Sequence, residues 1–457
     1  MRGTVERDED TADEKDAVHQ IGELRAQGCR LYYFVPNFAS DAYVWRAVFH
    51  AYLCGFSAAD RAALILLVPE GDCSAVLGEM QEHLLACGTD APLVLVYPYT
   101  EELLSTVLQR EDCLVTTKET VSLCCAEIAA RAGAEIVYGM DWHPHHRVYD
   151  VSVCVATYRS DDEKLFTTLT SVIRQQGCSI EILIGDDGSA EFDAQHITLW
   201  LLQRGCKDFQ ILHSPENQGT VKNAMRMFLH AHGRYLKLIS PGDYLYGDRV
   251  LADMMHFMQE SGYRIAFGRA CYYHREVGRY TIVDRMNPTY LRPHRERDIA
   301  AVKQAYLICQ DYAVGASFMG ERHLVTAYMK ELAGRVVYTE DAVYMLMIAD
   351  DIVLGFWDQN FVWYEYDAGI SSGHSDVWRA RIFQDNCAAL AVLAARHPEL
   401  RALCSWHTRG RPWEPPYAPI LLEQHNTMER TMERESYLQN VDPTELQKLV
   451  YAPVDFA

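Results

Sequence analysis

The stretch Ile180-Glu-Ile-Leu-Ile184 followed by Gly185-Asp-Asp-Gly-Ser189 decides how this chain folds. Its first half has the length and the apolar content of a buried strand, and the glycines of the second half predict a tight turn. Two neighbouring carboxylates, Asp186 and Asp187, therefore stand at the carboxyl end of a strand. In open α/β sheets this is the edge at which ligands bind.

Strands and helices are predicted to alternate on both sides of this stretch. Val151–Ala156 is an apolar run of buried-strand length that ends at Thr157-Tyr158, and apolar residues at helical spacing follow it. The later elements are predicted as strand Phe209–His213, turn Asn217–Asn223, strand Tyr235–Ile239, turn Ser240–Tyr244, helix Val250–Ser261, strand Arg264–Gly268, a separate aromatic strand-like segment Cys271–Tyr290, helix Ala342–Ala349, strand Phe361–Tyr366 and a final helix from Trp378 to about Arg396.

This order of strands, a double aspartate, an Asn-Gly turn and a strand ending in Pro-Gly-Asp resembles the amino-terminal half of the family 2 glycosyltransferases, which have the GT-A fold. The resemblance covers roughly residues 151–395, a little over half of the chain. It implies an inverting transfer from a nucleotide-diphosphate sugar, with UDP-sugars favoured. The acceptor would be a hydroxyl group of a glycan, a lipid-linked molecule or a protein, in bacterial surface glycan or glycoprotein synthesis.

The resemblance also assigns the donor nucleotide to the carboxyl edge of the sheet. A strand-end carboxylate such as Asp187 can accept hydrogen bonds from a uracil-like N–H or from ribose hydroxyls, and Lys222 offers positive charge to the phosphates. The alternative is that Asp186 or Asp187 only caps the next turn. The donor-binding residues implied by the resemblance are Thr157, Tyr158, Asp186, Asp187, Asn217, Gly219 and Lys222.

A divalent cation, Mn²⁺ or Mg²⁺, is the cofactor that the resemblance implies, because such ions balance diphosphate charge. The family carries an Asp-x-Asp motif at the end of the fourth strand. Here the positions read Ser240-Pro-Gly-Asp243, so a single carboxylate is left as the metal candidate. His374 is a candidate for a later ligand, although a lone loop histidine is more often not one.

The catalytic pair implied by the resemblance is Glu340-Asp341, at the start of a predicted helix. In the family the aspartate is the general base that takes the proton from the acceptor hydroxyl. The alternative is that both acids only stabilise a helix N-terminus through its dipole.

The chain before this region predicts a second α/β domain. Five apolar strands alternate with helices, which is the pattern of a doubly wound, Rossmann-like sheet. Thr116–Val121 is loosely similar to the nucleotide-binding half of a GT-B glycosyltransferase; docking and nucleotide binding are both open for this domain. The expected boundaries are 1–16 for a disordered acidic tail, 17–146 for the Rossmann-like domain, 147–400 for the GT-A domain and 401–457 for a partly helical extension.

Composition limits the class of protein. The formal net charge of −21 argues against nucleic-acid partners, which require clustered Lys and Arg. Fourteen cysteines without metal-ligand spacing predict reduced, mostly buried thiols. No transmembrane segment or signal peptide is predicted, so we expect a cytoplasmic protein, with the inner face of the membrane as an alternative location. A homo-oligomer is compatible with the sequence.

Two functions from different classes follow. The first is an inverting glycosyltransferase. The second is a glycosyltransferase-like protein that binds a sugar nucleotide or a partner protein without turnover. The incomplete Asp-x-Asp motif favours the second function, whereas Asp186-Asp187 and Glu340-Asp341 favour the first.

Overall fold

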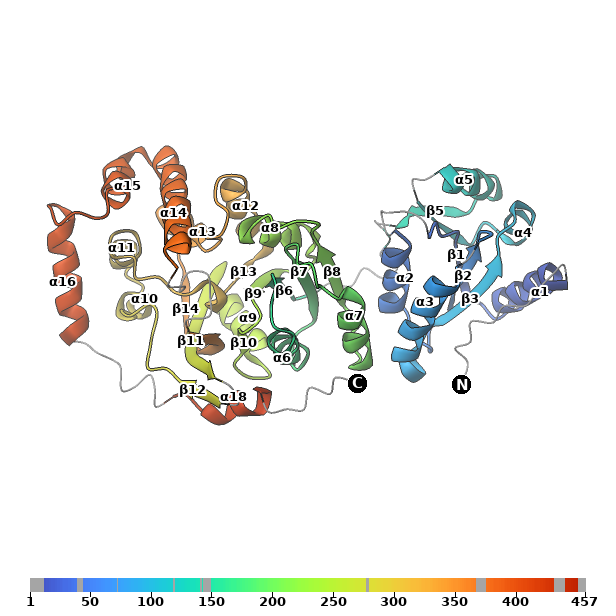
Figure 1. The fold of residues 1–457 in the computed structure, drawn as a ribbon, viewed down its shortest axis with the longest axis horizontal. Helices are drawn as coiled ribbons and strands as arrows, with labels where there is room; N and C mark the ends of the chain where they lie inside the picture. Colours follow the sequence, from blue (N-terminus) through green and yellow to red (C-terminus); the bar gives the residue numbers. More distant parts are fainter. Residues whose placement is uncertain are drawn as a thin grey trace. The chain divides into compact units, whose positions relative to one another are not determined.

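The structure, a computed structural model, describes residues 12–38, 44–71, 73–117, 120–139, 142, 149–276, 279–366, 375–430 and 440–450. The chain divides into two compact units (Figure 1). One unit holds residues 1–147 and 193–208, and the other holds residues 148–192 and 209–457. Each unit is described by itself below.

The first unit is built on a parallel sheet of five strands in the order β3-β2-β1-β4-β5. This order, which changes direction at β1, confirms the predicted doubly wound architecture. Its elements are α1 (Ala12–Ala26), β1 (Arg30–Phe34), α2 (Val44–Gly55), β2 (Ala62–Val68), α3 (Ser74–Ala86), η1 (Gly88–Asp90), β3 (Leu93–Pro98), α4 (Glu101–Val107), β4 (Cys113–Thr116), α5 (Thr120–Ala132), β5 (Glu135–Tyr138) and α7 (Ala194–Gln203).

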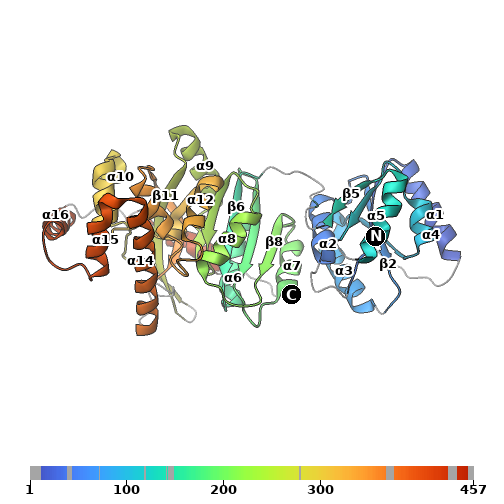
Figure 2. The same cartoon turned by 90° about the horizontal axis from the view of Figure 1, so that it is seen from above.

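Successive side chains of the central strands point to opposite faces of the sheet, and they are apolar on both faces. On β1, Leu31 and Tyr33 pack in one core with Ala17 and Ile21 of α1 and with residues of α4 and α5. Figure 2 shows α2 and α3 on one side of the sheet and α1 and α4 on the other. Helix α1 begins at Ala12, so the prediction of a disordered tail is wrong for residues 12–16; residues 1–11 lie outside the described part of the chain.

The second unit is built on a mixed sheet in the order β10-β14-β11-β13-β9-β6-β7-β8, with β12 paired to β11. Strands β8, β7, β6 and β9 are parallel, so their carboxyl ends share one edge. The strands are β6 (Val151–Thr157), β7 (Ile180–Asp186), β8 (Phe209–His213), β9 (Tyr235–Ile239), β10 (Tyr244–Leu245), β11 (Ile265–Glu276), β12 (Arg279–Ile282), β13 (Phe318–Glu321) and β14 (Gly355–Glu365).

Helices cover this sheet and share an apolar core with it. Residues of α8, α12, α13, α14 and α15 share one apolar cluster with residues of β6, β7, β9, β11 and β13. The helical elements of the unit are α6 (Asp162–Ile173), α8 (Thr220–His230), α9 (Val250–Ser261), α10 (Arg292–Glu296), α11 (Ile299–Lys303), η3 (Gln304–Cys309), η4 (Gly315–Ser317), α12 (Arg322–Leu332), α13 (Ala342–Ala349), α14 (Asp376–Arg396), η5 (Pro398–Leu400), α15 (Arg401–Thr408), α16 (Tyr417–Arg430) and α18 (Pro443–Val450).

Two sequence predictions need correction in this unit. The segments at 264–268 and from 271 onward are one continuous strand, β11, with register shifts around Arg269. The described residues beyond 400 also belong to the compact unit. Trp406 of α15 is fully buried in the apolar cluster that the helices share with the sheet, and Leu446 and Leu449 of α18 are buried against strands of the sheet.

The fourteen cysteines are all free thiols. Six of them are buried, seven are half-buried and Cys124 is exposed, so the prediction that most are buried is wrong. Among the described residues, no helix combines the length and apolarity that crossing a bilayer requires.

Candidate active site

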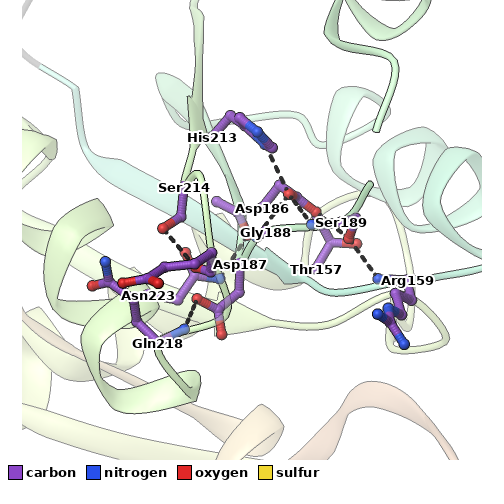
Figure 3. Close-up of polar contacts among 12 residues, drawn as sticks. Thr157, Arg159, Asp186, Asp187, Gly188, Ser189, His213, Ser214, Gln218 and Asn223 are labelled. Carbon is purple, nitrogen blue, oxygen red and sulfur yellow. Dashed lines mark hydrogen bonds and ion pairs between the residues drawn. The ribbon is translucent and has the colours of Figure 1, made fainter. Parts of the chain in front are cut away.

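The candidate site lies at the shared carboxyl edge of β6, β7 and β9. Thr157, the last residue of β6, is paired in register with Asp186, the last residue of β7 (Figure 3). The turn Ser240–Asp243 directly follows β9, which pairs with β6 on its other side. Parallel strand order therefore brings the two aspartates and the Pro-Gly-Asp turn to one edge, as the sequence predicts.

Asp186 builds the turn that follows β7. Its side chain is fully buried, and one carboxylate oxygen accepts hydrogen bonds from Gly188 N at 3.0 Å and from Ser189 N at 2.8 Å. The other oxygen accepts the Ser189 hydroxyl at 2.6 Å, and His213 Nδ1 lies 2.9 Å from the first (Figure 3). Asp186 therefore caps the turn that follows it, which was one of the two roles left open by the sequence, because its carboxylate is enclosed by the turn.

Asp187 fixes the start of α8. Its two carboxylate oxygens accept hydrogen bonds from Gln218 N at 2.9 Å and from Gly219 N at 2.8 Å (Figure 3). Its own N–H donates to Thr157 O at 2.9 Å. A carboxylate that bonds the loop before a helix satisfies N–H groups that would otherwise lack partners. Asp187 therefore shapes the Asn-Gly turn, and it keeps only 4% of its surface exposed.

The loop after β6 offers an accessible aromatic ring. Tyr158 is 40% exposed, and the Arg159 guanidinium lies 5.1 Å from the centre of its ring. Arg159 adopts a positive φ of 47°, and its N–H donates to Ser189 Oγ at 2.7 Å. Thr157 is buried, with its hydroxyl 2.5 Å from that of Ser160. The loop is thus tied to the Asp186 turn and presents Tyr158 to solvent.

The Asn-Gly turn contains one position that only glycine fits. Gly219 has a φ of 90°, and a Cβ there would lie 2.3 Å from Val337 Cγ1 and 2.6 Å from Val337 O. Asn217 and Lys222, on either side, are exposed. This turn is therefore pressed against the segment that leads to Glu340.

Asp243 lies at the far end of the Pro-Gly turn and is 8% exposed. One of its carboxylate oxygens accepts a hydrogen bond from Ser240 N at 3.0 Å. Burial raises the pKa of Asp243 to about 7, with a further contribution from Glu365, against the lowering effects of the Ser240 N–H and Lys237. Among the described residues, no cluster of three His, Cys, Asp or Glu side chains could hold a metal ion; His374 lies outside them.

Two lysines beside this turn were missed by the sequence analysis. Lys237, in the middle of β9, is fully buried, donates to the carbonyl oxygens of Ala316 and Phe318, and lies 4.5 Å from the centre of the Phe361 ring. Lys164 of α6 forms an ion pair with Glu365 at 2.6 Å. The interruption of an apolar strand by Lys237 was the only sequence signal for a buried cation.

Glu340 and Asp341 stand at the start of α13 and are half-buried. Asp341 occupies the N-cap position, but its side chain makes no capping hydrogen bond. A capping hydrogen bond therefore does not occupy this carboxylate, whereas stabilisation through the helix dipole, which needs no such bond, stays an alternative. Gly315 leaves room in front of the pair, since a Cβ there would lie 3.5 Å from Asp341 Cβ and 3.7 Å from Glu340 Oε1.

Burial raises the pKa of both acids, and the Asp341 charge acts on Glu340. Burial, the Asp341 charge and the Asp243 charge raise the pKa of Glu340 to about 8, and burial also raises the pKa of Asp341. Glu340 also lines a small apolar cavity with Phe318, Val343 and Tyr344. We expect Glu340 to hold the proton near neutral pH while Asp341 is ionised, because two adjacent carboxylates rarely ionise together.

This assignment predicts that Glu340→Gln stabilises the protein at neutral and alkaline pH. The folded protein keeps the Glu340 proton between pH 4.5 and about 8, whereas the unfolded chain loses it, so wild-type stability falls as pH rises through this window. Gln carries no proton to lose. We expect a gain of roughly 1–3 kcal/mol at pH 8 and almost none at pH 4, measured by thermal unfolding.

The matched control is Glu276→Gln, which removes an exposed carboxylate at the end of β11. It should leave the pH dependence of the unfolding midpoint unchanged. A Glu340→Gln variant with the same stability difference at pH 4 and pH 8 would contradict the protonated state assigned to Glu340.

One family model matches part of the chain. Residues 152–319 match the model of glycosyl transferase family 2, which confirms the predicted resemblance. TarS 1–349 of S. aureus in complex with UDP is 13% identical with a TM-score of 0.36, over 54% of this chain and 65% of that chain. The mannosyltransferase PcManGT from Pyrobaculum calidifontis in complex with GDP-Man and Mn²⁺ is 15% identical with a TM-score of 0.38, over 67% of this chain and 86% of that chain.

These structural matches are distant. The match covers 65% of the TarS fragment in its UDP complex, which is less than two thirds of its length. No curated protein sequence matches the chain significantly.

Proposed function

We propose, from the premise that residues 152–319 form a family 2 glycosyltransferase domain, that this protein transfers a sugar from a nucleotide-diphosphate donor to a hydroxyl acceptor. The observation that carries the proposal is the Glu340-Asp341 pair. No other described residue donates a hydrogen bond to either carboxylate, and Glu340 lies close enough to the site edge for the Asp243 charge to raise its pKa. An uncommitted, half-buried carboxylate is what a general base requires.

The proposed reaction is a single displacement. The acceptor oxygen attacks the anomeric carbon and forms the new C–O bond. The bond between that carbon and the phosphate oxygen breaks, and its electron pair leaves with the nucleoside diphosphate. The Asp341 carboxylate takes the hydroxyl proton as the bond forms, so the configuration at the anomeric carbon inverts.

We place the donor on the loops at the carboxyl edge, with a UDP-sugar as the favoured class. The exposed Tyr158 ring offers a stacking surface for a base, and the exposed Lys222 offers charge to the phosphates. Asp187 acts indirectly in this scheme, because it orders the Gln218-Gly219 backbone beside the donor. Thr157, Asp186 and Asn217 frame the same loops.

A divalent cation fits Asp243 only as a complex with the donor. One carboxylate oxygen bonds Ser240 N, and the other receives no hydrogen bond from a described residue. Magnesium-type ions are commonly held by one or two carboxylates together with substrate phosphates and water. When bound, Mn²⁺ or Mg²⁺ would neutralise charge on the leaving diphosphate. Lys237 and Lys164 lie close enough to lower the pKa of this carboxylate, although burial lowers the pKa of Lys237 itself to about 7.

This arrangement predicts that the metal affinity depends on the nucleotide. With Mn²⁺ alone, we expect the free-ion signal in electron paramagnetic resonance to be unchanged by the protein. Adding UDP should reduce that signal, and Asp243→Asn should remove the reduction. Asp253→Asn, which alters an exposed acid on α9, is the control and should behave like the wild type. Tight Mn²⁺ binding without nucleotide would place the metal elsewhere.

The second candidate function is binding of a sugar nucleotide or a partner protein without turnover. Specific observations favour it: a single carboxylate stands at the metal position, and the carboxylates of Asp186 and Asp187 bond the protein's own backbone. Incubation with a panel of nucleotide sugars, with and without Mn²⁺, separates the two functions. Hydrolysis or transfer supports the enzyme, whereas nucleotide binding without either supports the binder.

The wider setting is proposed from the family alone. A glycan, a lipid-linked molecule or a protein would supply the acceptor hydroxyl, in bacterial surface glycan or glycoprotein synthesis. The cytoplasm or the inner face of the membrane would be the location. Acceptor screening with these three classes tests that setting.

A further inference from the structure

Asp385 lies in the middle of α14, outside the segment that matches the family, and is 6% exposed. Its carboxylate accepts three consecutive backbone N–H groups. Val337 N lies 3.2 Å and 3.1 Å from its two oxygens, and Tyr338 N and Thr339 N lie 2.5 Å and 3.3 Å from the second. A buried carboxylate with three such donors forms charge-assisted hydrogen bonds that fix the backbone it contacts.

The segment that Asp385 holds runs directly into the proposed base. Thr339 precedes Glu340-Asp341, and its carbonyl oxygen accepts a hydrogen bond at 3.2 Å from the N–H of Ala342, the first residue of α13. A shift of residues 337–339 would therefore move the carboxylates at the start of α13. No hydrogen bond from a described residue to the carboxylates themselves would resist that shift.

The same segment is held from its other side by the donor loops. Val337 O accepts a hydrogen bond from Val221 N at 3.0 Å, and Gly219 lies against Val337 without room for a side chain. Gly219 N is in turn bonded to Asp187. The backbone at 337 is thus clamped between Asp385 on α14 and the loop that Asp187 orders.

We propose that Asp385 is a positioning residue that sets the placement of Asp341 relative to the donor loops. This inference rests on the proposed function, because it assumes that Asp341 acts on an acceptor. Asp385 itself contacts neither reactant. Asp385 would act by holding the backbone of residues 337–339 and, through it, Asp341. Misplacement of a reacting group by about 1 Å can lower the rate roughly a hundredfold.

The test compares Asp385→Asn with Asp150→Asn. Asp150 also accepts a backbone N–H, from Ser179 at 2.8 Å, but at the amino end of β6, opposite the site. In Asp385→Asn an amide N–H₂ replaces one accepting oxygen and faces N–H donors. We expect a kcat lower by about tenfold to a hundredfold, a dissociation constant for UDP within about twofold of wild type, and an acidic limb of the pH–rate profile at lower pH, because a loosened segment hydrates Asp341.

Asp385→Glu serves as the conservative variant. It keeps an accepting carboxylate, so its kcat should lie between those of Asp385→Asn and wild type. If Asp385→Asn does not fold, Asp385→Glu tests the positioning role in its place. Asp150→Asn should change only the fraction of folded protein and leave the pH–rate profile in place. The positioning role is overturned if folded Asp385→Asn matches Asp150→Asn in kcat and pH profile, or if folded Asp385→Glu equals wild type when Asn does not fold. A wild type that binds UDP but transfers no sugar rejects the proposed function itself.

Discussion

Asp341→Asn should bind UDP with the wild-type affinity and transfer sugar at least roughly a hundredfold more slowly. Loss of a general base typically costs about 10²–10⁴ in rate, and a hundredfold corresponds to about 3 kcal/mol in barrier height. Asn keeps the shape of the side chain but cannot take the acceptor proton. Binding of UDP should be spared because a base that acts on the acceptor makes no essential contact with the nucleotide. Calorimetry with UDP and initial rates of transfer measure the two effects separately.

Asp351→Asn is the matched control for this prediction. Asp351 lies just beyond the other end of α13, is exposed and pairs with Lys303 at 2.6 Å. Its φ of 63° is one that Asn tolerates, so the substitution tests a lost charge near α13 without touching the site. We expect nearly wild-type transfer. If Asp341→Asn transfers sugar as fast as Asp351→Asn, another group is the base.

The second large effect is expected from Gly219→Ala. A φ of 90° is unfavourable for alanine, and the added Cβ would lie 2.3 Å from a side-chain atom and 2.6 Å from the backbone oxygen of Val337. Backbone strain and overpacking each cost about 1–3 kcal/mol. The midpoint of thermal unfolding should therefore fall by roughly 5 °C or more. Because Val337 lies in the segment before Glu340, transfer should also slow in the folded variant.

Gly262→Ala separates the clash from the backbone strain. Gly262 ends α9 with a φ of 75°, and a Cβ there would meet no atom within 4 Å. It should cost about 1 kcal/mol through its backbone alone, with unchanged transfer. Equal losses of stability in the two variants would show that the contact between Gly219 and Val337 is not tight in solution.

Much of this fold could be predicted because local patterns agree with it. Strands β8 and β9 and helices α9 and α13 have the predicted bounds, since each is a mostly apolar or amphipathic run with a turn at its end. The edge that carries Asp186, Asp187 and Asp243 was predictable for the same reason, because parallel strands end together.

What the sequence missed depends on residues far apart in the chain. The break predicted within β11 is a register shift, and Arg269 there is buried because it pairs with Asp358. The positions of Lys237 and Asp385 follow from backbone groups some 50 to 80 residues away, at Ala316 and Val337. No local pattern reports such a partner. The roles of Asp186 and Asp187 in the turns were open for a similar reason, since either carboxylate could face a ligand or the chain.

The packing of α18 has a consequence for how the protein is made. Leu446 and Leu449 lie in one apolar cluster with Tyr244 and Tyr273, and the Tyr273 hydroxyl donates to Gly242 O at 2.6 Å, in the turn that presents Asp243. During synthesis the strands of this cluster leave the ribosome long before α18 does. The nascent chain therefore lacks the apolar cover that α18 gives this cluster until residues 443–450 have left the ribosome, so the packing beside the Asp243 turn is completed only after that point.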